Sequence, residues 1–305
     1  MKSSMYQILS FLTLYLLALP LQAVEADPKP DPDFPPAIVE LTIPSAGQRM
    51  PALMYLANGP GPHPTVLLLH GFPGNEKNLD IAQDLRRNGF NVLFFHYRGA
   101  WGADGEYRIL NLADDVVAKH GKINLLFNNA GITLSKTFEH HSLADWEKII
   151  GINLWGVIYG CHFFLPHLRK QAGEAHIVNL SSMVAFVGPP SQTSYSTTKA
   201  AIKGFSESLW AEVHDEGIGV TVVHPGAIKT AIMDEAAAST DDPEAFAKIQ
   251  TMVEKFAMPP EKAAKKILKA VRKDKMRVVV GADALFFEGA KRALPEHIHK
   301  LFNLG

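Results

Sequence analysis

The sequence predicts an α/β fold built on a single doubly wound, mostly parallel sheet with an antiparallel hairpin at one edge. Apolar runs such as TVLLL (65–69) and VLFFH (92–96) are continuous, which is typical of strands buried on both faces. Amphipathic helical segments separate such runs, and this alternation favours parallel strands joined by crossover helices. Near the start, 38–43 and 50–56 alternate in polarity around a short turn, which indicates a hairpin.

The order of the strands follows from the crossovers. Residues 65–96 form a βαβ unit, after which the chain returns to the other flank of the first parallel strand, the point where the strand order reverses. The expected order across the sheet is 38–43, 50–56, 92–96, 65–69, 123–127, 176–180, 220–223 and 276–280.

The connecting segments have helical patterns. The expected helices are 75–88, 112–120, 142–169, 194–214 and 260–273. Gly89 is a stop signal for the first, and Ser142 with Asp145 forms a plausible capping box for the third. In such sheets ligands bind outside the carboxyl ends of the strands, so residues that directly follow a strand are the candidates for function.

Composition narrows the class of protein. With 305 residues, 47% hydrophobic and 20% charged, the chain is suited to a soluble globular fold, and disorder, collagen and coiled coil are excluded. Thirty basic against 31 acidic residues, interleaved along the chain, predict no nucleic-acid partner, and no local basic patch is evident. The single cysteine, Cys161, forms no internal disulfide and is expected in the core, and no Cys/His cluster has the spacing of a metal site.

The amino terminus has the layout of a secretory signal peptide. Lys2 precedes an apolar run over 8–19, and small residues follow around Ala23. We expect a cleaved signal over 1–26, hence a secreted or periplasmic protein with no membrane contact after cleavage. An uncleaved membrane anchor is the alternative. The proline-rich segment 27–36 is expected to be an extended linker.

One pair of residues has a spacing suited to acid–base chemistry. Tyr195 and Lys199 are four positions apart on a predicted helix, so they share one face with Cβ atoms about 5–6 Å apart. A nearby cation favours the phenolate and lowers the tyrosine pKa. Ser182 directly follows a strand, and Asn153 is a polar residue in an apolar helix. The alternatives are a solvated face for the pair, a turn residue for the serine and a surface amide for the asparagine.

Together with the strings around them, these four residues make the chain from about 112 to its end resemble a classical short-chain dehydrogenase/reductase. The matching strings, in family order, are NNAG (128–131), GINLWG (151–156), NLSS (179–182), YSTTK (195–199) and HPGAIKT (224–230). The resemblance implies a Rossmann-like fold and an NAD(P)-dependent oxidoreductase that acts on the CH–OH group of a secondary alcohol or on a ketone. It also implies a small-molecule substrate and a homodimer or homotetramer.

The resemblance implies a role for each matched residue. Tyr195 would be the acid/base, and Ser182 would hydrogen-bond the same substrate oxygen. Lys199 would lower the tyrosine pKa and bind the nicotinamide ribose, while Asn153 would kink its helix and position a water. The positions implied for NAD or NADP binding are Asn129, Ala130, Gly131, Tyr195, Lys199, Pro225, Gly226 and Thr230.

The front of the chain departs from that family. No TGxxxGxG fingerprint occurs within 1–111, so the sequence leaves dinucleotide binding open, although Gly71 and Gly74 stand where a phosphate-binding turn would lie. Residues 36–107 instead resemble the amino-terminal third of an α/β-hydrolase, through VLLLHGFPGN and FFHYRGAWGADGEY. No G-x-S-x-G nucleophile motif is present.

The sequence therefore predicts one Rossmann-like domain over 37–305, with a hydrolase-like part (37–111) and a dehydrogenase-like catalytic part (112–305). Two alternatives to a dehydrogenase stay open. One is a catalytically silent chimaera of the two parts. The other is a secreted esterase or binding protein that uses a cleft at 70–74.

Overall fold

The computed structural model describes residues 27–45, 48–69, 79–95, 112–171, 173, 175–230 and 232–303. The predicted signal peptide, the start of the first predicted helix and most of the hydrolase-like loop segments lie outside these residues, as do Gly71 and Gly74.

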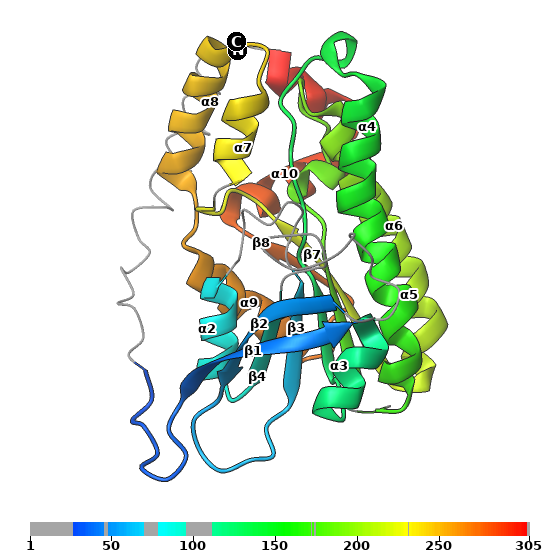
Figure 1. The fold of residues 1–305 in the computed structure, drawn as a ribbon. Helices are drawn as coiled ribbons and strands as arrows, with labels where there is room; N and C mark the ends of the chain where they lie inside the picture. Colours follow the sequence, from blue (N-terminus) through cyan, green and yellow to red (C-terminus); the bar gives the residue numbers. More distant parts are fainter. Residues whose placement is uncertain are drawn as a thin grey trace.

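Within the described residues, eight strands form one sheet in the order β1-β2-β4-β3-β5-β6-β7-β8, which confirms the predicted order (Figure 1). The strands are β1 (Ala37–Ser45), β2 (Gln48–Leu56), β3 (Thr65–Leu69), β4 (Asn91–Phe95), β5 (Leu125–Asn128), β6 (Ala175–Leu180), β7 (Ile218–Pro225) and β8 (Arg277–Val280). The β1–β2 hairpin joins the edge through an antiparallel pairing of β2 with β4, and the other neighbours are parallel. This is the mostly parallel α/β sheet that the continuous apolar runs predicted.

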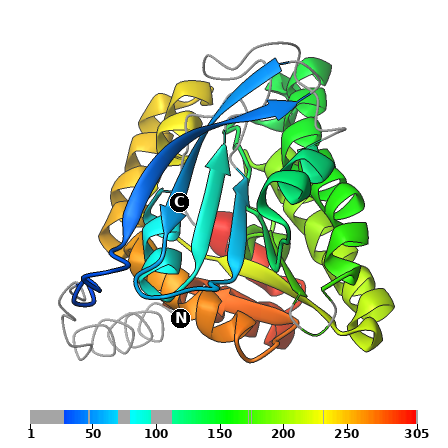
Figure 2. The same cartoon turned by 60° about the horizontal axis from the view of Figure 1, so that its bottom comes forward.

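Helices cover both faces of the sheet (Figures 1 and 2). They are α2 (Leu79–Arg87), α3 (Leu112–His120), α4 (Leu143–Ile150), α5 (Gly156–Arg169), α6 (Thr193–Val213), α7 (Ile232–Ser239), α8 (Pro243–Phe256), α9 (Pro260–Val271) and α10 (Ala282–Ala293). Helices α7, α8 and α10 were not among the predicted ones, since α7 and α8 fall in a polar, alanine-rich segment without strong apolar periodicity.

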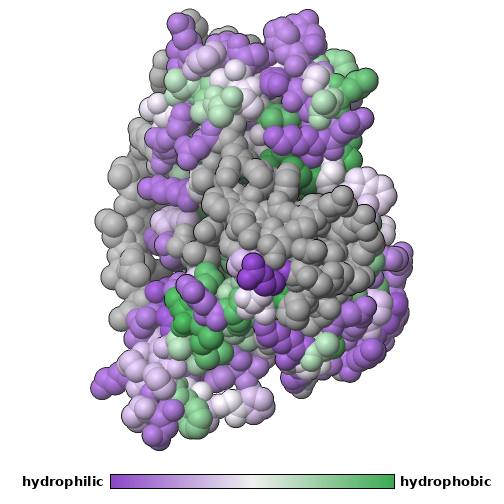
Figure 3. Space-filling model, in the orientation of Figure 1, coloured by the Kyte–Doolittle hydropathy of each residue, from purple (hydrophilic) through white to green (hydrophobic). Residues whose placement is uncertain are grey.

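The core has two layers, one on each side of the sheet. In β3, Leu67 packs with residues of α3, α5 and α6, whereas Val66 and Leu68 pack with residues of α2 and α9. All three side chains are fully buried. Successive strand residues point to opposite faces, so burial on both faces requires the continuous apolar runs seen in the sequence. Hydrophilic side chains cover most of the described surface in the view of Figure 3.

The long predicted helix 142–169 is interrupted. It begins as predicted, because Ser142 Oγ accepts a hydrogen bond from Asp145 N and the Asp145 carboxylate accepts one from Ser142 N, both at 3.1 Å. Between α4 and α5, however, residues Gly151–Trp155 form a π-helical turn in which Gly156 N donates to Gly151 O, five residues back. This turn contains Asn153. The combined stretch Leu143–Arg169 is long and apolar enough to cross a bilayer by composition, and part of that apolar character belongs to the face of α5 that packs on the sheet.

Candidate active site

The candidate residues lie where β5 and β6 end and on the helices that cover those ends. Asn129, Ala130 and Gly131 follow β5, and Ser182 follows β6. Tyr195 and Lys199 lie in the first half of α6, and Asn153 lies in the π-helical turn. β5 and β6 are neighbouring parallel strands, so their carboxyl ends share one edge of the sheet.

The ammonium group of Lys199 is held inside this edge. Lys199 is 3% exposed, and its Nζ donates a 2.9 Å hydrogen bond to Leu180 O at the end of β6. A Cβ atom added at Gly131 would lie 3.2 Å from Lys199 Nζ and 3.5 Å from Asn153 Oδ1. The lysine, the asparagine and the backbone after β5 therefore meet at one point, and a glycine at 131 allows that close approach.

Asn153 joins the loop after β5 to helix α6. Its side chain is fully buried; Oδ1 accepts from Ile132 N at 2.8 Å, and Nδ2 donates to Ile132 O at 2.9 Å. The same Nδ2 is 3.0 Å from Thr198 Oγ1, one residue before Lys199. A buried amide with these partners is satisfied, so the sequence alternative of a surface amide is excluded. The π turn opens the helix where this side chain leaves it.

Tyr195 is half-buried against an apolar cluster of Ile132, Leu134 and Ile149. Lys199 Nζ lies 5.5 Å from the centroid of the tyrosine ring. The positive charge of a buried lysine therefore lies close to this ring.

Ser182 lies two residues after the end of β6 and caps a short 3-10 helix (Met183–Ala185), with its Oγ 3.3 Å from Val184 N. The neighbouring Ser181 has a different role, because its Oγ donates to the backbone oxygen of Lys199 at 2.7 Å. This bond ties the end of β6 to α6 and leaves Ser182 as the serine that the sequence assigned to the substrate.

His224 belongs to the HPGAIKT string, but the sequence alone assigned no role to it. It is fully buried, and its Nδ1 lies 3.1 Å from Ser182 O. A carbonyl only accepts, so Nδ1 carries the proton. Burial lowers the pKa of His224 to about 4, so the ring is neutral at neutral pH and holds the backbone of the candidate serine. Its position directly before Pro225 and Gly226 was the available signal.

The segment after β7 is packed from the other side by α10. A Cβ atom added at Gly226 would lie 2.1 Å from Asp283 Oδ1, and Asp283 Oδ2 accepts a 2.6 Å hydrogen bond from Ala227 N. A side chain at position 226 would therefore displace the Asp283 carboxylate from Ala227 N. Pro225 and Thr230 are half-buried in the same segment.

A second asparagine, Asn128 at the end of β5, joins this strand to β6 and to helix α5 by buried contacts. Asn128 is 2% exposed and donates to Asn179 Oδ1 at 2.8 Å and to Cys161 Sγ at 3.3 Å. Cys161 is buried, as predicted, and burial raises the pKa of its thiol to about 12. Among the described residues, no group of three or more His, Cys, Asp or Glu side chains is placed to hold a metal ion.

Comparison with known proteins places the chain in a family. A family model described as "short chain dehydrogenase" matches residues 74–241, so the match begins inside the predicted hydrolase-like part. The chain is 37% identical over 201 residues to "Putative oxidoreductase SadH" of Mycobacterium tuberculosis, covering 65% of this chain and 72% of that protein. It is 33% identical over 198 residues to "Probable oxidoreductase EphD" of Mycobacterium bovis, covering 63% of this chain and 33% of that protein.

Solved structures share the fold. A short-chain dehydrogenase from Streptomyces avermitilis matches with a TM-score of 0.62 and 23% identity, covering 79% of this chain and 97% of that one. A short-chain dehydrogenase/reductase from Burkholderia phymatum in complex with NAD matches with a TM-score of 0.64 and 21% identity, covering 77% and 94%. The chain therefore belongs to the short-chain dehydrogenase family of oxidoreductases.

Proposed function

We propose that this protein is an NAD(P)-dependent oxidoreductase that interconverts a secondary alcohol and a ketone, with Tyr195 as the acid/base. The observation that carries the proposal is the meeting of Lys199 Nζ and Asn153 Oδ1 beside Gly131, with Tyr195 one helical turn before the lysine. Each of these side chains has a defined partner that fixes its position.

The described residues fit the nicotinamide end of a dinucleotide. The loop Asn129–Gly131 is only half-buried, and Gly131 has no side chain that would crowd the Lys199 ammonium. This loop, with Lys199, Pro225 and Thr230, would hold the cofactor. Support also comes from two structural neighbours, from Burkholderia phymatum and Burkholderia cenocepacia, which were solved in complex with NAD and NADP respectively. When bound, NAD(P) accepts or supplies the hydride.

The chain's own residues handle the proton. During oxidation, the Tyr195 phenolate would accept the hydroxyl proton of the alcohol while the carbon-bound hydrogen leaves as hydride and the carbonyl forms. During reduction, the Tyr195 hydroxyl would return that proton to the carbonyl oxygen. Ser182 would donate a hydrogen bond to the same oxygen, where negative charge develops. Lys199 would keep the phenolate stable between these steps.

The continuity of the sheet favours this function over a silent chimaera. β3 comes from the predicted hydrolase-like part and pairs in parallel with β5 of the dehydrogenase part over residues 66–69 and 125–128. Leu67 and Leu126, one from each part, lie in the same apolar cluster. The two parts thus share one core, so the first part supports the strand that carries the Asn129–Gly131 loop. The esterase alternative depends on a cleft at 70–74, which lies outside the described residues.

The test measures the reduction of a panel of ketones from the decrease in NADH or NADPH absorbance. Tyr195→Phe removes the exchangeable proton, and it is expected to lower kcat by about 10²–10⁴-fold. Tyr159→Phe, on the exposed side of α5, is the matched control and should retain activity. Unchanged turnover in Tyr195→Phe would refute the assignment. Absence of both turnover and calorimetric NAD(P)H binding would favour the silent chimaera.

A further inference from the structure

Helix α9 carries a concentration of positive charge that the sequence analysis overlooked. Its apolar side, with Ile267 and Leu268, is buried against the sheet. From 261 to 275 the chain has seven Lys or Arg residues against Glu261 and Asp274, a net charge of +5 in a protein whose total is −1. All seven cations are exposed: Lys262, Lys265, Lys266, Lys269, Arg272, Lys273 and Lys275.

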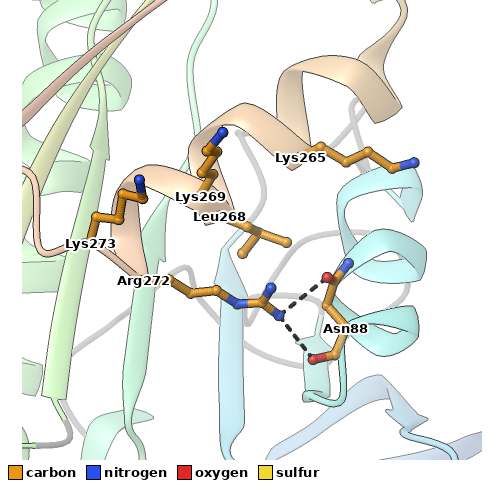
Figure 4. Close-up of a pocket in the computed structure, with 6 residues that line it drawn as sticks. All are labelled: Asn88, Lys265, Leu268, Lys269, Arg272 and Lys273. Atoms are coloured by element: carbon orange, nitrogen blue, oxygen red, sulfur yellow. Dashed lines mark hydrogen bonds between the residues drawn. The ribbon is translucent and has the colours of Figure 1, made fainter. Parts of the chain in front are cut away.

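Four of these cations surround a cavity between α9 and α2. The basic face, as we call it, consists of Lys265, Lys269, Arg272 and Lys273, and the cavity of about 310 Å³ is completed by Leu268 and Asn88 (Figure 4). Arg272 Nη2 donates to Asn88 O at 3.3 Å and to Asn88 Oδ1 at 3.2 Å, both neutral acceptors. These contacts fix α9 to the end of α2 without cancelling the charge of the arginine.

The proline-rich segment 27–36 begins beside this face. Asp27, the first described residue, forms ion pairs with Arg86 at 3.1 Å and with Arg87, in the last turn of α2 and directly before Asn88. The Arg87 contact lowers the pKa of the Asp27 carboxyl, so the pair persists at neutral pH. Leu19, the end of the apolar run, is eight positions before Asp27, and an extended chain covers at most about 30 Å over that distance. The apolar run therefore ends within reach of the basic face.

The basic face lies away from the candidate active site. Helix α2 runs from the end of β3 to the start of β4, so its last turn lies at the amino ends of these parallel strands. The site lies at the carboxyl ends of β5 and β6. In Figure 1, α2 and α9 occupy the lower half of the molecule, and α7 and α8 lie at the top. A large partner on the basic face would leave the substrate crevice accessible.

We propose that the basic face docks on a membrane surface rich in anionic phospholipids, with the apolar amino-terminal run retained as the adjacent anchor. Charge complementarity gives the basic face its partner: phosphate headgroups attract clustered Lys and Arg side chains next to a hydrophobic anchor. The sequence favours lipid over nucleic acid, because an apolar run that ends eight positions before Asp27 can enter a bilayer but has no partner on a nucleic acid. This proposal is independent of the dehydrogenase activity.

The test measures cosedimentation of the full chain with two kinds of vesicles, phosphatidylcholine alone and phosphatidylcholine mixed with phosphatidylglycerol. Insertion of the apolar run would bind both kinds of vesicle alike, so only the basic face would distinguish them. Partition into the mixed vesicles is expected to be stronger by about tenfold or more at low salt and to fall toward the neutral level at high salt. Equal partition into both vesicles at low salt overturns the proposal.

Charge variants locate the effect. The triple variant Lys265→Glu, Lys269→Glu, Lys273→Glu should lose the preference for the anionic vesicles, and the milder glutamine triple should lose most of it. The matched control changes three exposed lysines elsewhere, Lys148, Lys170 and Lys300, to glutamate and should keep it. Circular dichroism confirms that each variant is folded.

Three further outcomes would overturn the proposal. The first is an equal loss of preference in the control variant. The second is displacement from anionic vesicles by a DNA duplex at a phosphate concentration below that of the lipid, which would assign the face to nucleic acid. The third is an intact mass, for protein recovered from vesicles, that lacks the apolar run.

Discussion

Two histidines, the partly buried His176 and the buried His224, are expected to make the protein less stable as the pH falls from about 7 to about 5. His176 Nε2 lies 2.8 Å from Thr221 Oγ1, whose own proton goes to Lys275 O. His224 donates from Nδ1 to Ser182 O, and its Nε2 has no hydrogen-bond partner within the described part of the chain. The Nδ1 atom of His176 lies 3.7 Å from Asp274 Oδ1, a contact that favours the protonated ring but is outweighed by burial. Burial is the main cause that lowers the pKa of each to about 4.

The direction and size of this loss of stability follow from the difference in proton binding between the folded and unfolded chain. The ordinary histidine pKa is 6.5, so between about pH 6.5 and 4 the unfolded chain binds protons that the folded protein does not. The free energy of unfolding therefore falls through this window and is flat above it. At about pH 5 the loss is about 2 kcal/mol for each histidine. Carboxylates with lowered pKa values, such as Asp145, add their loss only at lower pH, below about 4.

The assay is urea unfolding followed by circular dichroism at three pH values across this window. His176→Gln and His224→Gln remove the titrating rings, so each should flatten the pH dependence by about half, and the double variant by nearly all. His162→Gln, at an exposed position on α5, is the control and should keep the wild-type slope. A double variant with the full wild-type loss of stability would refute the reasoning.

Two further predictions concern buried polar groups. Asn153→Leu leaves both backbone groups of Ile132 without their partner, and it is expected to lower the free energy of unfolding by about 2–4 kcal/mol, measured by urea titration. Thr198→Val removes a single contact of the Asn153 amide and should lower the free energy of unfolding by less. Equal losses in the two variants would contradict this account. Cys161 should be inert to a thiol reagent in native buffer, because it is buried and its pKa is raised to about 12, and it should react once urea unfolds the chain. Rapid labelling of the native protein would contradict its placement.

The strand order was predictable because it follows from local signals and one topological rule. Continuous apolar runs identify strands buried on both faces, and the reversal of direction after β4 leaves β5 only the free flank of β3. The π-helical turn was not predictable in the same way. Its sequence, GINLW, continues the apolar pattern of the flanking helices, and the turn differs only in which carbonyl the Gly156 amide reaches.

In the candidate site, too, contacts between residues close in sequence were predictable, whereas contacts between distant residues were not. The sequence identified Tyr195 and Lys199 because four residues of helix bring them together whatever the rest of the chain does. It could not reveal that His224 holds the Ser182 carbonyl, because that contact joins residues 42 positions apart. It also could not reveal that Asp283 fills the space beside Gly226, or that Asp27 binds the end of α2.

The sequence alone determined the alternation of strands and helices, the order of the sheet and the motifs that identify the family, because each depends on neighbours within a few residues or on a rule of chain connection. The tertiary structure decided where the lysine ammonium lies and which buried groups stay neutral. These properties depend on packing between distant segments, which sets burial and hydrogen-bond partners, and through them the charge of each group.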